Sequence, residues 1–195
     1  MLFRSAVSAA ATRYLAAPDS RVLALIGSGV QAEAHLEALT QLHPYDEIRV
    51  WSRTPEHAAR FAAAHGIVAT DIEGAVRGAD VVVTATNALE PIVKGAWLKP
   101  GAHVNAVGSP RPGWRELDDA AMRNTLIVDS REAVMKESGD VILSGAPIHA
   151  ELGEIFAGLK PAPARETTIF KSVGLAIEDV ATAKLVYDLA SSAAA

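Results

Sequence analysis

The segment Gly27-Ser28-Gly29-Val30-Gln31-Ala32 follows a GxGxxA pattern, directly after the apolar run 21–26 and before the helix-like stretch 30–42. In dinucleotide-binding folds the first glycine permits a tight turn, and the second lets the backbone approach a pyrophosphate. The small third residue lets helix and strand pack closely, and the first amides of the helix bind phosphate. A glycine turn after a strand is common by itself, but this context predicts a dinucleotide site that includes Gly27, Gly29, Val30 and Gln31.

The end of the second strand-like segment, 48–51, indicates which dinucleotide is bound. Sites for NAD place Asp or Glu about 20 residues after the glycines, where it accepts from the ribose 2′-hydroxyl. Here the strand is followed by Ser52-Arg53-Thr54, and the acidic pair Asp46-Glu47 precedes it. Arginine forms charge-assisted contacts with a 2′-phosphate, and the flanking hydroxyls can add donors. We therefore expect NADPH to be preferred over NADH. The alternative is an exposed Arg53 beside a Thr54 that only caps the next helix.

Two further segments should end at the same edge of the sheet. Thr84 and Thr86 lie at the end of segment 79–86, and Val107-Gly108-Ser109 lies at the end of segment 102–107. Open α/β sheets bind ligands at the carboxyl ends of their strands. We expect the two threonine hydroxyls to reach the ribose or phosphate of the cofactor, although threonine is also common at strand ends. Val107, Gly108 and Ser109 should lie near the nicotinamide.

These residues require a framework of alternating strands and helices. Strands separated by helix-length segments indicate βαβ units, and hence an α/β, Rossmann-like doubly wound parallel sheet with helices on both faces. In this interpretation an N-terminal helical segment, 1–20, precedes an NAD(P)-binding domain, 21–165, and a C-terminal strand and helix, 166–195. The predicted strands are 21–26, 48–51, part of 79–86, 102–107, 126–129 and 167–170. The predicted helices are 5–15, 30–42, 55–65, 147–158 and 174–189, followed by a fraying tail at 189–195.

Composition narrows the classes of function. The 195 residues are 50% hydrophobic, which suffices for a folded core. A formal net charge of −5 without a run of basic residues argues against nucleic acid or anionic membranes as partners. The sequence has no cysteine, which excludes disulfides and thiolate chemistry. No apolar run approaches the ~18–20 residues of a membrane span, and the first residues lack a secretory cleavage pattern. We expect a cytoplasmic protein.

Other ionisable residues have simpler interpretations. The six histidines are scattered without HxH or HExxH spacing, so no metal site is expected. His103 lies in a predicted strand and is interpreted as a hydrogen-bonded structural residue. The segments Lys136-Glu137-Ser138-Gly139-Asp140 and Glu151-Leu152-Gly153-Glu154 can form an acid/base or metal site. Helix-terminal and capping groups are the simpler interpretation of both.

The sequence resembles the ornithine cyclodeaminase/μ-crystallin family. Eight ordered blocks carry the resemblance, among them Arg115-Glu116-Leu117-Asp118 and Phe170-Lys171-Ser172-Val173-Gly174; the full set is 4–6, 26–32, 50–54, 100–108, 115–118, 136–140, 151–154 and 170–174. The resemblance implies a Rossmann domain, a second domain for substrate and dimerisation, and NAD(P)-dependent chemistry on small amino or imino acids. Residues 1–20 would be shared with that second domain, of which this chain holds only a remnant, because relatives have a sizeable segment before the position of Arg4. That segment carries an active-site lysine, and its absence is expected to impair activity.

The resemblance also implies roles for individual residues. Arg4 matches the arginine that pairs with the substrate carboxylate, and Ser5 matches a position that touches the cofactor. Cyclodeaminases carry a catalytic aspartate where this chain has Pro110, and proline cannot transfer a proton. The expected function is therefore NADPH-dependent reduction of a cyclic imino acid, such as pyrroline-2-carboxylate, by a homodimer. Ornithine cyclodeaminase activity, alanine dehydrogenase activity and a non-catalytic NADPH- or ligand-binding module remain alternatives.

Overall fold

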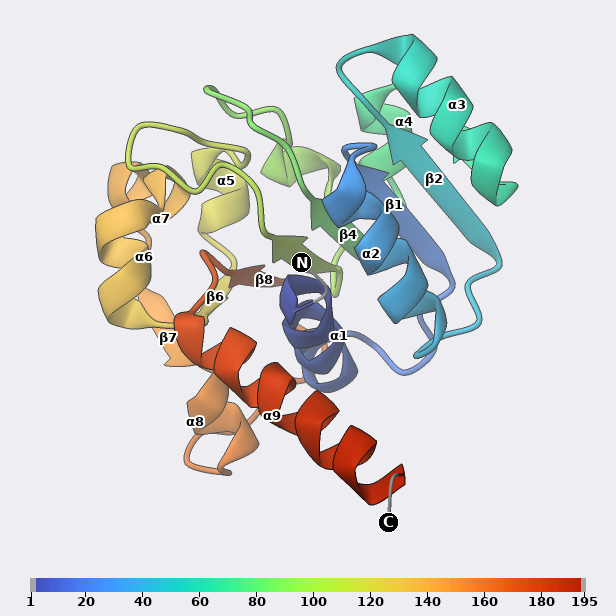
Figure 1. Ribbon diagram of the computed structural model, residues 1–195. Helices are drawn as coiled ribbons and strands as arrows, with labels where there is room; N and C mark the ends of the chain where they lie inside the picture. The colour runs from blue at the N-terminus through green and yellow to red at the C-terminus, as the bar shows by residue number, and fades with distance from the viewer. Residues whose placement is uncertain (1–2, 194–195) are drawn as a thin grey trace.

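A computed structural model describes residues 3–193, and within them eight parallel strands form one sheet (Figure 1). The strand order is β3-β2-β1-β4-β5-β8-β6-β7. Because both faces of the sheet are covered, its inner strands are almost continuously apolar, as β1 and β4 are. The strands are β1 (Val22–Ile26), β2 (Glu47–Trp51), β3 (Val68–Ala69), β4 (Val81–Thr84), β5 (His103–Ala106), β6 (Thr125–Val128), β7 (Ile148–Glu151) and β8 (Thr168–Lys171).

Helices cover both faces, which confirms the α/β doubly wound prediction. One face packs against α1, α2, α3 and α8, and the other against α4, α5, α6 and α7. The helices are α1 (Phe3–Leu15), α2 (Val30–Thr40), α3 (Pro55–His65), α4 (Ile72–Val76), the 3-10 turn η1 (Gly95–Trp97), α5 (Asp119–Met122), α6 (Arg131–Glu137), α7 (Gly139–Ser144), α8 (Leu152–Phe156) and α9 (Ala176–Ala193).

Two sequence predictions for the last third of the chain are wrong. Residues 147–158 are predicted as one helix, but β7 occupies 148–151 and pairs with β6, and only α8 follows. Glu151 ends the strand and begins α8 in a capping box with Glu154, so the capping interpretation of these acids is confirmed. The predicted tail at 189–195 is helical through Ala193, and its last two residues lie outside the described part of the chain.

Buried polar contacts attach α1 to the sheet. Asn105 Nδ2 of β5 donates to Thr12 Oγ1 of α1 at 2.9 Å. His103, in the same strand, contacts Asn105 Oδ1 at 3.3 Å and Thr168 Oγ1 of β8 at 2.8 Å. Burial lowers the pKa of His103 to about 4, so its ring is neutral. The structural interpretation of His103 is confirmed.

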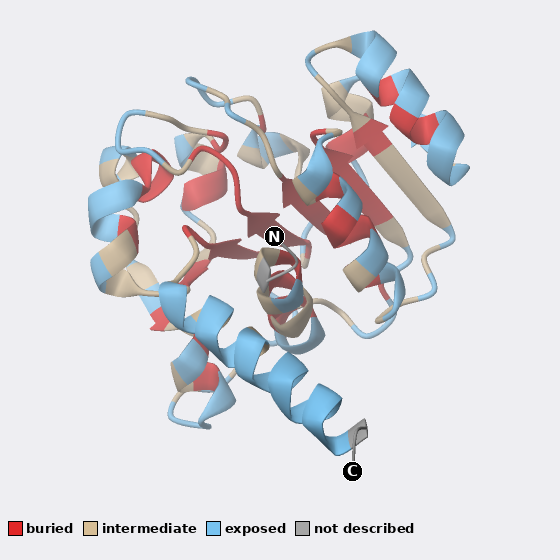
Figure 2. Cartoon of the chain, in the orientation of Figure 1, coloured by how far each residue is buried: buried red, intermediate tan, exposed pale blue. Residues whose placement is uncertain are grey.

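The C-terminal helix α9 has a different environment from the other helices. It contacts α1 and extends along the lower edge of the molecule, and most of its surface is exposed (Figures 1 and 2). Its exposed side chains include large apolar ones: Ile177, Val180, Leu185, Val186, Tyr187 and Leu189. Across residues 3–193, α9 included, helices with the length and apolar character to cross a bilayer are absent.

Candidate functional site

The order of the strands locates a crevice at the carboxyl edge of the sheet. The chain runs outward from β1 through β2 to β3 and then returns to place β4 on the other side of β1. The loops after β1 and β4 therefore diverge, and ligands bind at such a switch point in α/β sheets. A cavity of about 570 Å³ lies there. Of the predicted cofactor residues, its lining includes Gly27, Gly29, Ser52, Arg53 and Thr86.

The glycine loop has the geometry that its pattern predicts. Gly27 has φ of +127°, and a Cβ atom there would lie 2.6 Å from the carbonyl oxygen of Ala85, so a side chain does not fit. Gly29 is the N-cap of α2, and a Cβ there would meet nothing within 4 Å. The amide of Glu33 makes the first intrahelical bond, to Gly29 O at 3.1 Å. The preceding amides of α2 are thus left for another acceptor, and the loop fits a dinucleotide phosphate.

The other end of this cavity carries positive charge. Ser52 and Arg53 line it after β2, and His57 joins them from the first turn of α3. Among residues 3–193, Arg53 has no acid within ion-pair distance. Thr54 is the N-cap of α3 but its side chain makes no capping hydrogen bond, and it does not line the cavity. The arrangement leaves Arg53 available to an anionic group.

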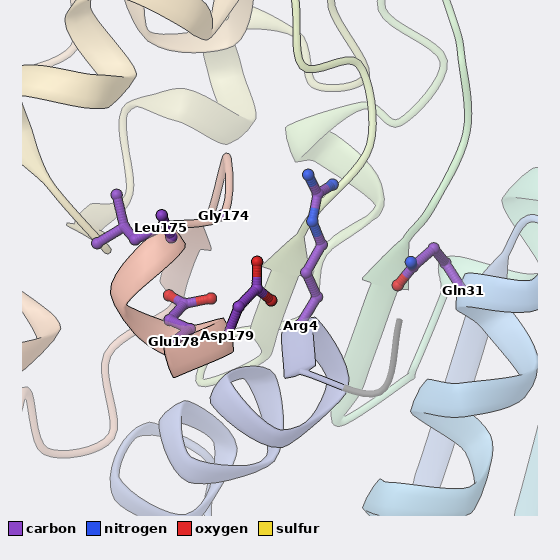
Figure 3. A pocket seen from close by; sticks show the side chains of 7 residues that line it. Arg4, Gln31, Gly174, Leu175, Glu178 and Asp179 are labelled. Atoms are coloured by element: carbon purple, nitrogen blue, oxygen red, sulfur yellow. The ribbon is translucent and has the colours of Figure 1, made fainter. Parts of the chain in front are cut away.

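Arg4 lines a second cavity of about 450 Å³, on the α9 side of the α2 N-terminus. Its guanidinium donates to Val173 O at 3.0 Å and approaches Val107 O at 3.5 Å. Gln31 borders the cavity from α2, and Glu178 and Asp179 border it from the first turn of α9 (Figure 3). Burial and the charge of Asp129 raise the pKa of Glu178. The cavity therefore offers both a cation and carboxyl groups to a small ligand.

The hydroxyls of Thr84, Thr86 and Ser109, residues that are predicted to lie at the cofactor, have hydrogen-bond partners within the protein. Thr84 is fully buried, and its hydroxyl lies 2.6 Å from Glu116 Oε2. Thr86 Oγ1 donates to Glu116 Oε1, also at 2.6 Å, although Thr86 still lines the first cavity. Ser109 is buried, has φ of +47° and donates to Ala88 O at 2.7 Å. These hydroxyls hold the protein's own loops.

The remaining predicted residues do not line either cavity. Ser5 is buried in α1, and Val30 is exposed at the start of α2. Val107 and Gly108 are buried, and the carbonyl oxygen of Val107 lies 3.5 Å from Arg4 Nη1.

Three buried ionisable residues lie at this edge, and the sequence prediction gives a role to only one of them, Asp140. Glu116, Asp140 and Lys171 are each fully buried, and Lys171 Nζ lies 2.9 Å from Asp140 Oδ2. The helix-terminal interpretation of Asp140 is therefore incomplete. The sequence signal that could have found Lys171 is a charged side chain that directly follows apolar residues of a strand, as in Ile169-Phe170-Lys171.

This chain is similar in sequence to known proteins. The family model described as "Ornithine cyclodeaminase/mu-crystallin family" matches residues 3–194. The ketimine reductase mu-crystallin of Mus musculus is 55% identical over an alignment of length 192, which covers 96% of this chain and 61% of that protein. The chain thus spans about three fifths of the length of this curated relative.

Two solved structures have the same fold. The Δ(1)-pyrroline-2-carboxylate reductase of Thermococcus litoralis, in complex with NADH and L-proline, has a TM-score of 0.88 and 41% identity, and the match covers 95% of this chain and 63% of that one. An archaeal alanine dehydrogenase dimer with bound NAD has a TM-score of 0.89 and 35% identity, covering 98% of this chain and 64% of that one. Relatives of this chain therefore bind nicotinamide cofactors.

Proposed function

This chain belongs to the ornithine cyclodeaminase/mu-crystallin family, and from that premise we propose that it binds NADPH and reduces the C=N bond of a cyclic imino acid. The observation that carries the proposal is the pair of cavities on the two sides of the α2 N-terminus. One contains the Gly27 loop and Arg53, and the other contains Arg4. The relatives named for ketimine and pyrroline-2-carboxylate reduction support the choice of substrate class.

The preference for NADPH is argued from the residues after β2. Gly27, Gly29 and the first amides of α2 would hold the pyrophosphate. Arg53 would contact the 2′-phosphate of the adenosine ribose, with Ser52 beside it. Ser52 and Arg53 line the cavity directly after β2, where an NAD site would place an acid that accepts from the 2′-hydroxyl; the carboxylate of Glu90 lines it from the chain after β4 instead. When bound, the nicotinamide supplies the hydride.

Arg4 would bind the substrate carboxylate. Its guanidinium has five N–H groups, and the carbonyls of Val173 and Val107 use two of them. The others remain to pair with a carboxylate in the cavity. The two carbonyl groups, one after β5 and one after β8, hold the Arg4 guanidinium in place before the substrate arrives. This orientation lowers the entropy cost of binding the substrate.

Glu178 and Asp179 would favour a protonated substrate nitrogen. They face the same cavity as Arg4 from the first turn of α9 (Figure 3). A protonated imine accepts hydride better than a neutral one, so a proton donor or an anion beside the nitrogen assists the reaction. Burial raises the pKa of Glu178, which favours the protonated form of that carboxyl group.

The test is a titration with NADPH and with NADH, followed by NADPH oxidation with pyrroline-2-carboxylate or piperideine-2-carboxylate. Tighter binding of NADPH and turnover of either imino acid support the proposal. Equal affinity for the two cofactors overturns the preference. Tight NADPH binding without turnover would instead support the binding module, and oxidation of NADH with pyruvate and ammonia would support alanine dehydrogenase activity.

A homodimer is part of the proposal. The archaeal alanine dehydrogenase is a dimer, and in this chain α9 exposes six large apolar side chains on one helix. Exposed apolar side chains that cluster on one element are typical of sites that contact another protein. Light scattering on the purified chain tests the assembly, and a monomer at all concentrations contradicts it.

A further inference from the structure

Three charged side chains that the proposed chemistry does not use form one buried network behind the two cavities. The carboxylate of Glu116 accepts from Thr84 Oγ1, Thr86 Oγ1, Thr86 N and Gly108 N, at 2.6 to 3.0 Å. Asp140 Oδ1 accepts from the amides of Glu116 and Leu117 at 2.9 and 3.0 Å. Asp140 Oδ2 accepts from Lys171, so the network runs without a break from β4 to β8.

The network holds Gly108 from both sides. The amide of Gly108 donates to Glu116, and its carbonyl oxygen accepts from Lys171 Nζ at 2.7 Å. A Cβ at this position would lie 2.3 Å from Glu116 Oε1 and 2.4 Å from Thr86 O, so the loop and the carboxylate fit together only around glycine. Glu116 therefore sets the position of the chain after β5 relative to the chain after β4.

The same backbone also holds Arg4. The two carbonyl groups that face its guanidinium belong to Val107, which precedes Gly108, and to Val173, two residues after Lys171. Asp129 Oδ2 accepts from the amides of Val173 and Gly174 at 2.8 and 2.9 Å and restrains that segment from the other side. Through Gly108 and Lys171, the network is thus connected to both carbonyl groups that orient Arg4.

We propose that Glu116 and Lys171 are positioning residues that hold the Thr86 wall of the cofactor cavity in register with the Arg4 guanidinium. The identity of the ligands in this inference rests on the proposed function, whereas the contacts of Glu116 and Lys171 are independent of it. Four donors converge on one carboxylate, which can accept all of them. A neutral amide in its place would turn an NH₂ group toward at least one of these donors. Glu116→Gln therefore changes the contacts with little change of shape.

Asp80 provides a matched control at the opposite edge of the sheet. Its Oδ2 accepts from the amides of Arg21 and Val22, both at 2.8 Å, and its Oδ1 pairs with Lys99. Like Glu116, it is a mostly buried carboxylate that holds backbone amides and lies near a lysine. Asp80→Asn should therefore disturb the fold in a similar way without reaching either of the two cavities.

Binding of two ligands distinguishes a positioning role of Glu116 from a general destabilisation of the fold. In the proposed binding mode NADPH would span the crevice from Arg53 toward Arg4, whereas 2′,5′-ADP would occupy only the adenosine end. We expect Glu116→Gln to weaken NADPH binding about tenfold or more and to change 2′,5′-ADP binding by less than twofold. In Asp80→Asn both dissociation constants should stay within twofold of the wild type. Calorimetric titration of the full chain measures all of them.

The titrations test the positioning role of Glu116 and the proposed function separately. Equal weakening of both ligands by Glu116→Gln, or equal effects of the two substitutions, overturns the positioning role. A wild-type chain that binds neither ligand overturns the proposed function and the inference with it. If Glu116→Gln does not fold, Thr84→Val removes one of the four contacts without altering a charge. It should weaken NADPH binding about threefold, and Thr84→Ser should restore it; failure of the serine variant to do so contradicts the inference.

Discussion

The hydroxyl oxygen of Ser8 in α1 lies 3.0 Å from Nε2 of His35 in α2, and both residues are fully buried. The other ring nitrogen of His35 contacts the carbonyl oxygen of Gln31 at 2.7 Å, which requires the proton to be on Nδ1. Ser8 then donates to Nε2. The helix that carries Arg4 and the helix that begins at the glycine loop are therefore joined by one specific hydrogen bond.

Replacing Ser8 by alanine should weaken this junction. It leaves the acceptor nitrogen of His35 buried without its partner, which costs about 1–3 kcal/mol. We expect Ser8→Ala to lower the free energy of unfolding in urea by that amount. Thr40→Ala is the matched control, because the Thr40 hydroxyl bonds only to carbonyls of its own helix. Equal losses in the two variants would argue against the junction.

The stabilisation that comes from the neutral, buried His103 should fall as the pH is lowered from 7 to 5. The pKa of His103 is about 4 in the folded protein, against about 6.5 in the unfolded chain. The unfolded state binds the proton first, so the stabilisation present above pH 6.5 is lost as the pH falls toward the folded pKa. Linkage gives a loss of about 2 kcal/mol between pH 7 and 5 for this residue. Burial also lowers the pKa of His35, which adds a loss of the same sign.

Urea denaturation at the two pH values measures the change. His103→Asn should remove a large part of the difference between pH 7 and 5, because asparagine does not titrate. An unchanged difference in this variant would show that His103 does not cause it.

Arg53→Asp should reverse the cofactor preference. The substitution places a carboxylate where a 2′-phosphate would lie and where a 2′-hydroxyl could donate instead. We expect NADPH affinity to fall at least tenfold and NADH affinity to stay constant or rise. Arg60→Asp makes the same charge change on an exposed residue later in α3 and should leave the ratio of the two affinities within twofold. Similar ratios in both variants would mean that Arg53 acts only through net charge.

Arg4→Lys should separate substrate binding from cofactor binding. Lysine cannot reproduce the planar fork that pairs with a carboxylate and the two backbone carbonyls. We expect KM for the imino acid to rise about a hundredfold, while the dissociation constant of NADPH changes by less than threefold. Arg13→Lys, on an exposed residue at the other end of α1, is the control. A comparable rise of the NADPH dissociation constant would contradict the assignment of Arg4 to the substrate.

Much of the fold could be predicted from local patterns. The runs at β1 and β4 are almost continuously apolar because both faces of the sheet are covered, and such runs are visible in the sequence. The segment 147–158 is wrongly predicted as one helix because β7 is an edge strand with mixed polar and apolar residues. Its conformation as a strand is decided by pairing with β6. Short edge strands carry little local signal.

Part of the candidate site could likewise be predicted from the local sequence, and part could not. The glycine loop and Arg53 could be predicted because their roles depend on neighbouring residues. Glu116 could not, because its partners Thr84 and Thr86 lie 32 and 30 residues away in the chain. The pairing of Lys171 with Asp140, 31 residues apart, likewise appears only when β8 is placed in the sheet. The contact of the two threonine hydroxyls with Glu116 therefore has no signal in the local sequence.

The position of β8 has a consequence for synthesis of the chain. β8 lies between β5 and β6 and pairs with both, so the two parts of the sheet have no hydrogen bonds to each other without it. A ribosome delivers these residues after both neighbouring strands, and until then each part presents an open strand edge. Nascent chains that stop before residue 168 should be prone to aggregate and to need a chaperone. Insertion of this one short strand completes the sheet and brings Lys171 Nζ within hydrogen-bond distance of Gly108 O.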